Sequence, residues 1–262
     1  MRRVPVAITI AGSDSGGGAG IQADLKTFLA LGVFGTSAIT CLTAQNPEAV
    51  TGIAATAPRM VALQIQAVCR AFPVAAAKTG MLYSAGIIGA VAAAIAELKI
   101  RPLVVDPVMV ATSGARLLRE DAVAALRSAL LPLARVVTPN VPEAEILWGH
   151  AIGSLADLKQ AAAGISRTHG TACLAKGGHL AGDEAADVLC DRGRIRVFSG
   201  PRVHTTQTHG TGCTLSAALT AFLARGETLE RAAAAAKAFV TAALTQANRA
   251  GRHCVLNFLP HG

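Results

Sequence analysis

The chain has 262 residues, of which 52% are hydrophobic, and its 24 Lys and Arg outnumber its 16 Asp and Glu to give a formal net charge of +8. This length fits one large α/β domain or two small ones. The basic residues form no run of five or more and are not interleaved with aromatic residues, which disfavours nucleic acid as a partner. A positive charge of this kind better suits phosphorylated small molecules.

The six cysteines are spread through apolar segments and include no C-x-x-C pair. That pattern disfavours a zinc site and predicts reduced, buried thiols in a cytoplasmic protein. Residues 1–3 resemble the basic start of a signal peptide, but the apolar stretch after them is short and contains Pro5 and Thr9, so we expect no signal peptide. The uncharged stretch Thr79–Ala96 is long enough to span a bilayer. Its glycines favour a turn and a buried helix instead, and we expect no membrane partner.

The first segment, Val4–Ala11, is a continuous run of β-forming residues and predicts a buried strand. It leads into a glycine-rich loop over residues 12–20. Helical spacing then predicts a helix over Ile21–Leu31, which Gly32 ends. A strand, a glycine loop and a helix in this order are typical of phosphate or ligand binding, although the sequence contains neither a P-loop nor a G-x-G-x-x-G motif.

The rest of the chain alternates between strand-like and helix-like segments. Further strands are predicted at Gly35–Thr43, Val50–Thr56, Val74–Ala77, Leu103–Val105, Arg135–Thr138, Ala172–Ala175, Asp187–Asp191 and Ile195–Ser199. Further helices are predicted at Pro58–Phe72, Ala85–Leu98, Arg119–Leu131, a short segment ending at Trp148, Leu155–His169, Leu215–Ala224 and Leu229–Arg249. This alternation predicts one α/β domain over residues 1–262, with a mostly parallel sheet and helices on both faces.

A second glycine-rich stretch, Thr208–Thr214, stands directly before the apolar helix at Leu215–Ala224. Glycines let an anion approach the unpaired N–H groups at a helix start, so Gly210, Thr211 and Gly212 predict a phosphate site. Cys213 in the same turn is a candidate base or nucleophile, because a helix N-terminus stabilises a thiolate. It can equally be a small buried thiol.

Several polar residues follow predicted strands, at the sheet edge where ligands bind. Lys176, beside two glycines, is placed to reach a phosphate, or is a solvated loop lysine. Asp106, Asn140 and Glu143 carry the oxygens that Mg²⁺ prefers. Asn140 can instead cap the helix that follows it, and Asp106 can be a turn residue before proline.

Three residues are candidates for holding an organic substrate. Gln45 ends a strand, and its amide can pair with the edge of an aminopyrimidine, or serve turn chemistry. Asp24 follows the first glycine loop by one helical turn and can face the same pocket, or be a surface acid. Met81 can wall an aromatic ligand, although a core position is its default role.

Six motifs, in this order, resemble the hydroxymethylpyrimidine/phosphomethylpyrimidine kinases of thiamine biosynthesis, which belong to the ribokinase-like superfamily. The motifs are Ala11–Lys26, Thr40–Asn46, Asp106–Met109, Thr138–Glu145, Lys176–His179 and His209–Leu215. The resemblance runs from about residue 4 to residue 245. It implies a ribokinase-like three-layer αβα sandwich. It also implies ATP-dependent phosphorylation, with Mg²⁺, of 4-amino-5-hydroxymethyl-2-methylpyrimidine and then of its monophosphate.

The resemblance also implies roles for individual residues. Gly210–Cys213 would form an anion hole, with Cys213 where sugar kinases of the superfamily keep an Asp base. Lys176 would contact the ATP phosphates, and the metal would be organised by Asp106, Asn140 and Glu143. Gln45 would bind the pyrimidine. The residues around that ring would be Gly12, Ala19, Asp24, Met81 and Val108.

Three positions depart from the family pattern: Gln207 replaces a common Asn, Lys78-Thr79 a common Lys-Ile pair, and Gly17 a common Ser. A pyridoxal kinase of the same superfamily is therefore the nearest alternative, and a pyrimidine- or nucleotide-binding sensor without catalysis is an alternative of another class. The first glycine loop and Val110–Arg116 are candidate lids. We expect a cytoplasmic homodimer.

Overall fold

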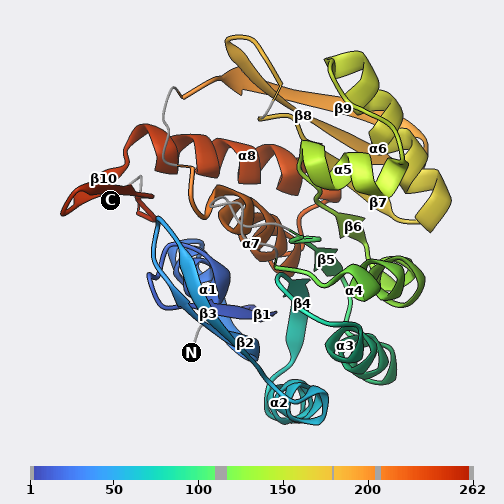
Figure 1. Cartoon of the computed structure of the whole chain (residues 1–262), viewed down its shortest axis with the longest axis vertical. Helices are drawn as coiled ribbons and strands as arrows, with labels where there is room; N and C mark the ends of the chain where they lie inside the picture. The colour runs from blue at the N-terminus through green and yellow to red at the C-terminus, as the bar shows by residue number, and fades with distance from the viewer. Residues whose placement is uncertain (1–2, 110–116, 179, 204–207, 260–262) are drawn as a thin grey trace.

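The computed structural model describes residues 3–109, 117–178, 180–203 and 208–259. Within them, nine strands form one sheet in the order β3-β2-β1-β4-β5-β6-β7-β8-β9 (Figure 1). These strands are β1 Val6–Asp14, β2 Phe34–Gln45, β3 Val50–Ala55, β4 Val74–Thr79, β5 Leu103–Val105, β6 Val136–Val137, β7 Ala172–Lys176, β8 Glu184–Asp191 and β9 Arg194–Pro201. The proposed lid segment Val110–Arg116, His179 and Gln207 lie outside the described residues.

The centre of the sheet is parallel and its two edges are antiparallel. Strands β2, β1, β4, β5, β6 and β7 pair in parallel, whereas β3, β8 and β9 each pair antiparallel with a neighbour. The predicted mostly parallel sheet is thus confirmed. Because all six parallel strands end on the same side, the loops after them meet at one edge of the sheet.

Helices cover both faces of the sheet (Figure 1). They are α1 Gly20–Ala30, α2 Pro58–Ala71, α3 Ala85–Glu97, α4 Glu120–Ala125, α5 Val141–Trp148, α6 Leu155–His169, α7 Thr211–Ala224 and α8 Leu229–Thr245. One core joins the sheet to α2 through α6, and two smaller cores join it to α1, α7 and α8. Strand β5 illustrates how a central strand is buried on both faces. Leu103 and Val105 enter the first core, and Val104 enters the core formed with α7 and α8.

Three of the predicted helices differ from the structure by more than one residue, and one of them, predicted to begin at Leu215, begins at Thr211. The segment predicted as one helix over Arg119–Leu131 is α4, then a π-helical turn Leu126–Leu130 and a 3₁₀ turn Leu131–Leu133. Pro132 lacks an N–H group and cannot continue the α-helical ladder. The last helix ends at Thr245, not near Arg249.

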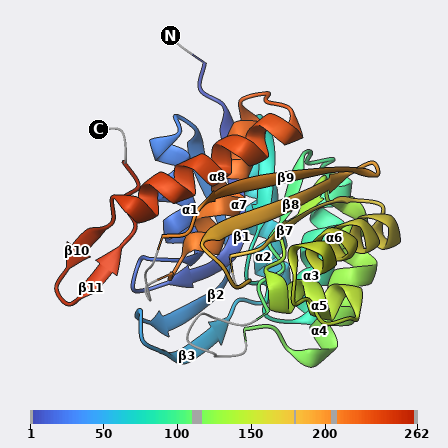
Figure 2. The ribbon, with the colours of Figure 1, turned by 90° about the horizontal axis from the view of Figure 1, so that it is seen from above.

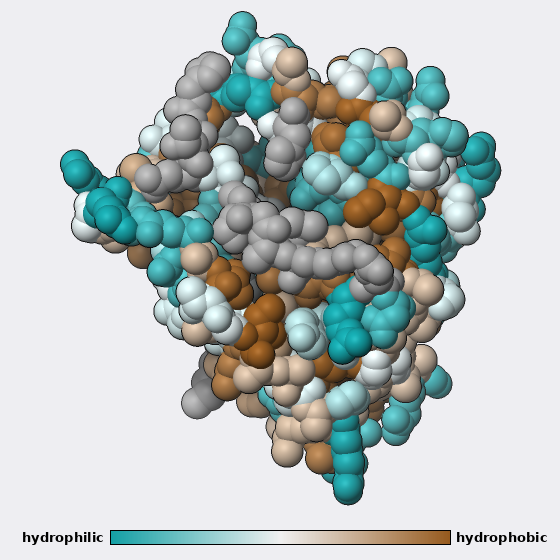
Figure 3. Space-filling view, in the orientation of Figure 1, coloured by the Kyte–Doolittle hydropathy of each residue, from teal (hydrophilic) through white to brown (hydrophobic). Residues whose placement is uncertain are grey.

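The chain after α8 forms a small hairpin that the sequence did not predict. Its strands are β10 Asn248–Ala250 and β11 His253–Val255, joined by a turn in which Gly251 has φ +60°. The hairpin projects beyond α8 (Figure 2), and its surface is hydrophilic (Figure 3). Mostly exposed polar residues give no apolar alternation, which is why no strand signal was present.

Two expectations from composition can be compared with the fold. No described helix is long and apolar enough to cross a membrane, and Thr79–Ala96 divides into the end of β4, a connection and α3. Cys41, Cys173 and Cys190 are buried, as predicted, whereas Cys69 and Cys213 are half-buried and Cys254 on the hairpin is exposed.

Candidate active site

A cavity of about 1170 Å³ opens at the carboxyl ends of the parallel strands. Its walls come from the loops after β5, β6 and β7, from the glycine loop after β1 and from the first turn of α7. Most of the predicted site residues line it: Ala19, Gln45, Asp106, Val108, Asn140, Glu143, Lys176, Gly210, Thr211, Gly212 and Cys213. Three others, Gly12, Asp24 and Met81, are buried and do not line it.

The turn before α7 has the geometry of an anion-binding helix start. The helix begins at Thr211, its N-cap is Gly210 with φ +82°, and no described side chain caps it. A Cβ atom on Gly210 would lie 1.8 Å from the carbonyl oxygen of Gly18, so no other residue fits there. A helix start of this kind can offer unpaired N–H groups to an anion that enters the cavity, while the N–H of Thr211 donates to the Thr208 carbonyl oxygen at 3.2 Å.

The carboxylate of Asp14 ties the two glycine-rich segments together, a role the sequence analysis missed. It accepts hydrogen bonds from the backbone N–H groups of Gly16, Gly18 and Ala19 at 2.8, 3.1 and 2.8 Å. It also lies 3.0 Å from Nε2 of His209, next to the anion-binding turn. Burial alone would raise the pKa of Asp14, but the bonds from His209 and from the backbone hold it below its usual value.

Lys176 and Asp106 form an ion pair at the middle of the cavity, here called the cavity pair. Nζ of Lys176 lies 3.0 Å from Oδ1 of Asp106, whose other oxygen accepts a hydrogen bond from Ser216 at 3.0 Å. Burial would lower the pKa of Lys176, but the carboxylates of Asp106 and Glu143 raise it, so the side chain is cationic. A Cβ atom on Gly212 would be 3.3 Å from this ammonium group, which places Lys176 over the anion-binding turn.

Asn140 and Glu143 form a capping box at the start of α5. Asn140 accepts a hydrogen bond from the Glu143 N–H, and Glu143 accepts one from the Asn140 N–H, each at 2.9 Å. The second carboxylate oxygen of Glu143 accepts a bond from the backbone of Met109 at 3.3 Å. The helix-cap alternative for Asn140 is therefore what the structure shows, and the same bonds fix Glu143 at the cavity wall.

The oxygen donors of this wall suit a hard divalent cation. Asp106 and Glu143 are 2% and 4% exposed and share one ammonium group, that of Lys176. Burial, opposed by Lys176 and reinforced by the neighbouring charge of Asp106, raises the pKa of Glu143. An added cation would relieve this excess of negative charge. Among the described residues, however, no three acidic, His or Cys side chains converge as a ready-made metal cage.

Cys213 lies half-buried at the cavity wall. The sequence predicted that the helix N-terminus would stabilise its thiolate, but the structure favours the neutral thiol. Burial raises the pKa of the Cys213 thiol to about 11. Lys78 and the backbone N–H of Gly20 oppose this rise, and the carboxylates of Asp24 and Asp106 add to it. Desolvation thus outweighs the helix N-terminus, and the free site holds a neutral thiol near pH 7.

Asp24 is neither a pocket-lining residue nor a surface acid. It is fully buried on α1 and forms an ion pair with Lys78 of β4, here called the buried pair, at 2.5 Å between Oδ1 and Nζ. Its other oxygen accepts a hydrogen bond from Thr9 at 2.6 Å. A single helical turn in the sequence could not reveal that a lysine 54 residues away meets it.

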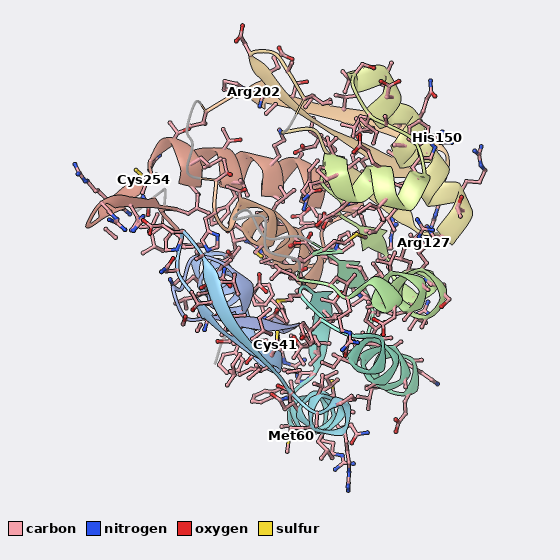
Figure 4. The ribbon with its side chains drawn as sticks, viewed as in Figure 1. Cys41, Met60, Arg127, His150, Arg202 and Cys254 are labelled. Carbon is pink, nitrogen blue, oxygen red and sulfur yellow. The ribbon has the colours of Figure 1, made fainter. Side chains whose placement is uncertain are left out.

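Met81 and Gly12 pack with Cys41 beside the cavity, not in its wall. Sδ of Met81 lies 3.7 Å from Sγ of Cys41, and Thr40 donates a hydrogen bond to the Met81 carbonyl at 2.6 Å. A Cβ atom on Gly12 would come within 2.8 Å of the Cys41 sulfur. The core alternative for Met81 fits this arrangement, in which Gly12 is small because Cys41 is close. Cys41 is labelled in Figure 4.

Gln45 also lines the cavity, and its side-chain amide is partly oriented. Its backbone exchanges hydrogen bonds with the Ser15 side chain at 2.7 and 2.8 Å, which ties β2 to the first glycine loop. Its side-chain oxygen accepts a bond from Thr43 at 3.1 Å. With the oxygen engaged, the amide N–H groups remain for a ligand.

Arg202, after β9, organises the cavity wall at Gly178 and was missed by the sequence analysis (Figure 4). Its guanidinium group donates to four backbone carbonyl oxygens, three in the loop between β7 and β8 and one at the start of β8. These belong to Gly178, Leu180, Gly182 and Glu184, at 2.5 to 3.2 Å. Lys237 of α8 and Asp187 of β8, 2.9 Å apart, complete this wall, and Asp187 also accepts the N–H of Gly177 at 3.0 Å. No local motif marks these contacts.

Comparison with known proteins extends over nearly the whole chain. A family model described as phosphomethylpyrimidine kinase matches residues 14–256. A hydroxymethylpyrimidine/phosphomethylpyrimidine kinase of Rhizobium meliloti is 51% identical over 93% of this chain and 92% of its own length. A thiamine biosynthesis bifunctional protein of Geobacter sulfurreducens is 48% identical over 94% of this chain, which spans half of that protein. A Bacillus subtilis pyridoxal kinase structure, an ADP complex, superposes with a TM-score of 0.91 at 37% identity, covering 98% of both chains.

Proposed function

Since the chain belongs to the phosphomethylpyrimidine kinase family and is therefore a kinase of the ribokinase-like fold, we propose its reaction as follows. It transfers the γ-phosphoryl group of ATP to the hydroxyl of 4-amino-5-hydroxymethyl-2-methylpyrimidine. It then phosphorylates the monophosphate to the diphosphate. The observation that carries this proposal is the convergence of Cys213, Lys176 and the start of α7 on one cavity that also contains Gln45.

Phosphoryl transfer depends mostly on positioning and on stabilising charge, and each group in the cavity has a part in that. The N–H groups at Gly210–Cys213 bind the transferred phosphoryl oxygens. The ammonium of Lys176 neutralises the charge that develops on them. Gln45, which lines the same cavity, holds the aminopyrimidine edge.

Cys213 serves as the base in this proposal. As the hydroxyl oxygen of the substrate bonds to the γ-phosphorus, the bond from that phosphorus to the β,γ-bridging oxygen breaks and ADP leaves. The O–H bond of the substrate breaks as well, and its proton passes to Sγ of Cys213 in its thiolate form. Because burial keeps the thiol protonated in the free site, turnover should increase as the pH rises above neutrality and the thiolate fraction grows. The second phosphorylation brings an anionic acceptor, which the helix start and the lysines accommodate.

Mg²⁺, when bound, supplies charge neutralisation and alignment of the nucleotide phosphates. The residues that would hold it are Asp106, Asn140 and Glu143, directly or through water. The capping box keeps two of these side chains in place before any ligand enters.

Pyridoxal is the second candidate substrate, because the Bacillus subtilis pyridoxal kinase has the same fold over the whole chain. ATP-dependent turnover of both alcohols separates the two possibilities. We expect the pyrimidine to be phosphorylated twice. Efficient use of pyridoxal with no pyrimidine phosphate formed would refute the proposal.

Replacing Cys213 with Ala tests the mechanism. Turnover should fall by about 10²–10⁴-fold, which is the usual contribution of a general base, while pyrimidine binding measured by calorimetry is retained. Full turnover in this variant would mean that Cys213 is not the base.

Assembly and location complete the proposal. We infer a homodimer in the cytoplasm, and the buried thiols at Cys41, Cys173 and Cys190 suit a reducing compartment. Sedimentation of the purified chain with and without ATP tests the dimer, and a monomer at micromolar concentration would contradict it.

A further inference from the structure

The chain after α8 returns to the edge of the sheet at which the cavity opens. Within the described residues, its β10–β11 hairpin pairs with no strand of the nine-stranded sheet, and it lies beside the turn between β2 and β3 (Figure 1). A two-stranded hairpin is at best marginally stable by itself, so its place depends on contacts with the rest of the protein. It also forms part of the cavity wall, because Cys254 on β11, labelled in Figure 4, lines the cavity together with Gln45.

The hairpin contacts the turn that follows Gln45. Nη2 of Arg252 lies 2.5 Å from Oε1 of Glu48, and Nε2 of His253 lies 3.9 Å from the same oxygen. Glu48 belongs to the turn between β2 and β3, and its backbone N–H donates to the side-chain oxygen of Asn46 at 2.8 Å. Because Asn46 is the residue next to Gln45, one short turn joins the hairpin to the residue that binds the pyrimidine in the proposed reaction.

The residues after the hairpin make a second contact, toward the first glycine loop. Nζ of Lys26 on α1 lies 5.4 Å from the centre of the Phe258 ring and donates a hydrogen bond to the Gly17 carbonyl oxygen at 2.7 Å. A cation at this distance from an aromatic ring is attracted to the face of the ring. The N–H of Asn257 donates to the Ala243 carbonyl oxygen at 3.1 Å, which fixes the segment to α8. Lys26 therefore joins the glycine loop to the C-terminal segment.

The two contacts meet in the same part of the site. Ser15 exchanges hydrogen bonds with the Gln45 backbone, which joins the first glycine loop to β2. The β2–β3 turn and the glycine loop thus form one unit, and residues 248–259 contact it at Glu48 and at Lys26. The cavity pair and the capping box, which face the phosphates in the proposed reaction, come from the ends of β5, β6 and β7 instead.

Stability of the whole fold does not explain these contacts. The side chains of Arg252 and Glu48 are 74% and 54% exposed, and ion pairs of this kind contribute little to the free energy of unfolding. A weak contact can still hold a loop in the arrangement that a ligand needs, and the ligand then does not have to order that loop itself. The gain is therefore expected in ligand affinity rather than in global stability.

We propose that residues 248–259 act as a strap, here called the acceptor strap, that positions the part of the site that binds the phosphoryl acceptor. Arg252 and Phe258 are its positioning residues: they act through Glu48 and Lys26 and do not touch the reacting atoms. The acceptor is an alcohol on a heteroaromatic ring, whose polar edge Gln45 binds. The strap rests on the proposed function only for the identity of this acceptor.

Steady-state kinetics of Arg252→Ala test the strap. The KM for the pyrimidine should rise about three- to fivefold, the ratio that corresponds to an exposed ion pair, while kcat and the KM for ATP should change less than about twofold. Arg196→Ala, which breaks the similarly exposed pair with Glu230, is the matched control and should leave all three constants unchanged. An unchanged KM for the pyrimidine in Arg252→Ala, or an equal rise for ATP, would overturn the proposal.

A double-mutant cycle tests whether Arg252 acts through Glu48. Glu48→Ala should raise the KM for the pyrimidine by a similar factor. The double variant Arg252→Ala/Glu48→Ala should be no worse than either single variant, because both substitutions remove the same contact. Effects that multiply in the double variant would show that the two side chains act separately and would contradict the strap. Phe258→Ala should raise the same KM and leave that for ATP unchanged.

Binding without turnover gives a second readout. Calorimetry with the pyrimidine alone should show the same loss of affinity, about three- to fivefold, in Arg252→Ala. The pyrimidine should also slow the alkylation of Cys254 by iodoacetamide, followed on its own peptide by mass spectrometry, because the hairpin forms part of the cavity wall. Half-buried Cys69 on α2 is not among the residues that line the cavity and should keep its rate. Equal Cys254 rates with and without the pyrimidine would place the hairpin away from the ligand and would overturn the proposal.

The same variants separate the strap from the proposed function. If the wild-type protein phosphorylates pyridoxal and not the pyrimidine, the proposed substrate is wrong. The strap then stands if Arg252→Ala raises the KM for pyridoxal by about the same factor, and it fails if that KM does not change.

Discussion

Two lysine–aspartate pairs lie beside the first turn of α7 and differ in their access to ligands. In the cavity pair, Lys176 and Asp106 are 13% and 2% exposed and lie 3.0 Å apart. In the buried pair, Lys78 and Asp24 are both 0% exposed and lie 2.5 Å apart. The same two residue types therefore do different things: a lysine at the cavity can exchange its carboxylate for a phosphate, whereas a sealed lysine can only act on its neighbours at a distance.

Breaking the cavity pair should give the largest effect. Lys176→Met removes the cation over the anion-binding turn, and kcat should fall by about 10³-fold because the developing phosphoryl charge loses a partner. The melting temperature should fall less than when the buried pair is broken, because Asp106 loses its ammonium partner but keeps its hydrogen bonds from Ser216 and Thr138. Steady-state kinetics and calorimetry check both statements. A variant with near-normal kcat would show that Lys176 does not contact the transferred group.

The buried pair should show the reverse pattern, with a large effect on stability. Asp24→Asn or Lys78→Met alone should cost about 3–5 kcal/mol in urea unfolding, because each leaves an unpaired buried polar or charged group. The double variant should recover much of that loss. Asp121→Asn, which breaks the exposed Arg119–Asp121 pair, is the matched control and should cost less than about 1 kcal/mol. Additive losses in the double variant would contradict a direct interaction.

The close contact between the two glycine-rich segments can be tested by replacing Gly210. Gly210 and Gly226 have similar φ angles, +82° and +88°, but an added Cβ meets the Gly18 carbonyl oxygen at 1.8 Å in the first case and nothing within 4 Å in the second. Both substitutions with Ala incur the left-handed backbone cost of about 1–2 kcal/mol. Gly210→Ala should lose about 1–3 kcal/mol more because the loops must separate, and ATP turnover should fall with it. Equal losses at both positions would argue against the contact between the loops.

The smallest expected effect is on the free energy of unfolding when Asp14, whose carboxylate joins the two glycine-rich segments, is replaced. Asp14→Asn should cost about 2 kcal/mol at pH 7, since charge-assisted hydrogen bonds are lost. The pKa of Asp14 in the folded protein lies below that of a free aspartate, so its stabilisation is present above about pH 4 and is lost as the pH falls through the folded pKa. Unfolding free energies of wild type and variant should converge below pH 4. A constant difference down to pH 2 would contradict this.

The sequence predicted most of the fold because its signals are local. The bounds of β5 and α6 were predicted correctly. Strand β5 is an apolar run between polar segments, and α6 begins after the capping residue Ser154 and ends before Gly170, so both signals are local. The β10–β11 hairpin carried no such signal. In the site, motif residues such as Lys176 and Gly210 were found from glycines and strand ends.

What escaped prediction in the site depends on distant partners. Asp24 was misplaced because its environment is decided by Lys78 on another strand. Arg202 and Asp14 looked ordinary because their partners are carbonyl and N–H groups of loops whose paths the sequence does not give. The raised pKa of Cys213 likewise reflects burial, which a helix-start motif alone does not reveal.

The contact between Asp14 and His209 spans 195 residues of sequence, and it bears on how the protein is made. The first glycine loop is synthesised before α7, so the carboxylate of Asp14 has no contact with His209, and Gly18 none with Gly210, until the start of α7 has been made. A nascent chain that stops before this point has the strands of the sheet and no phosphate site. Such a chain lacks the anion-binding turn, so anion binding at this cavity depends on α7 having been synthesised.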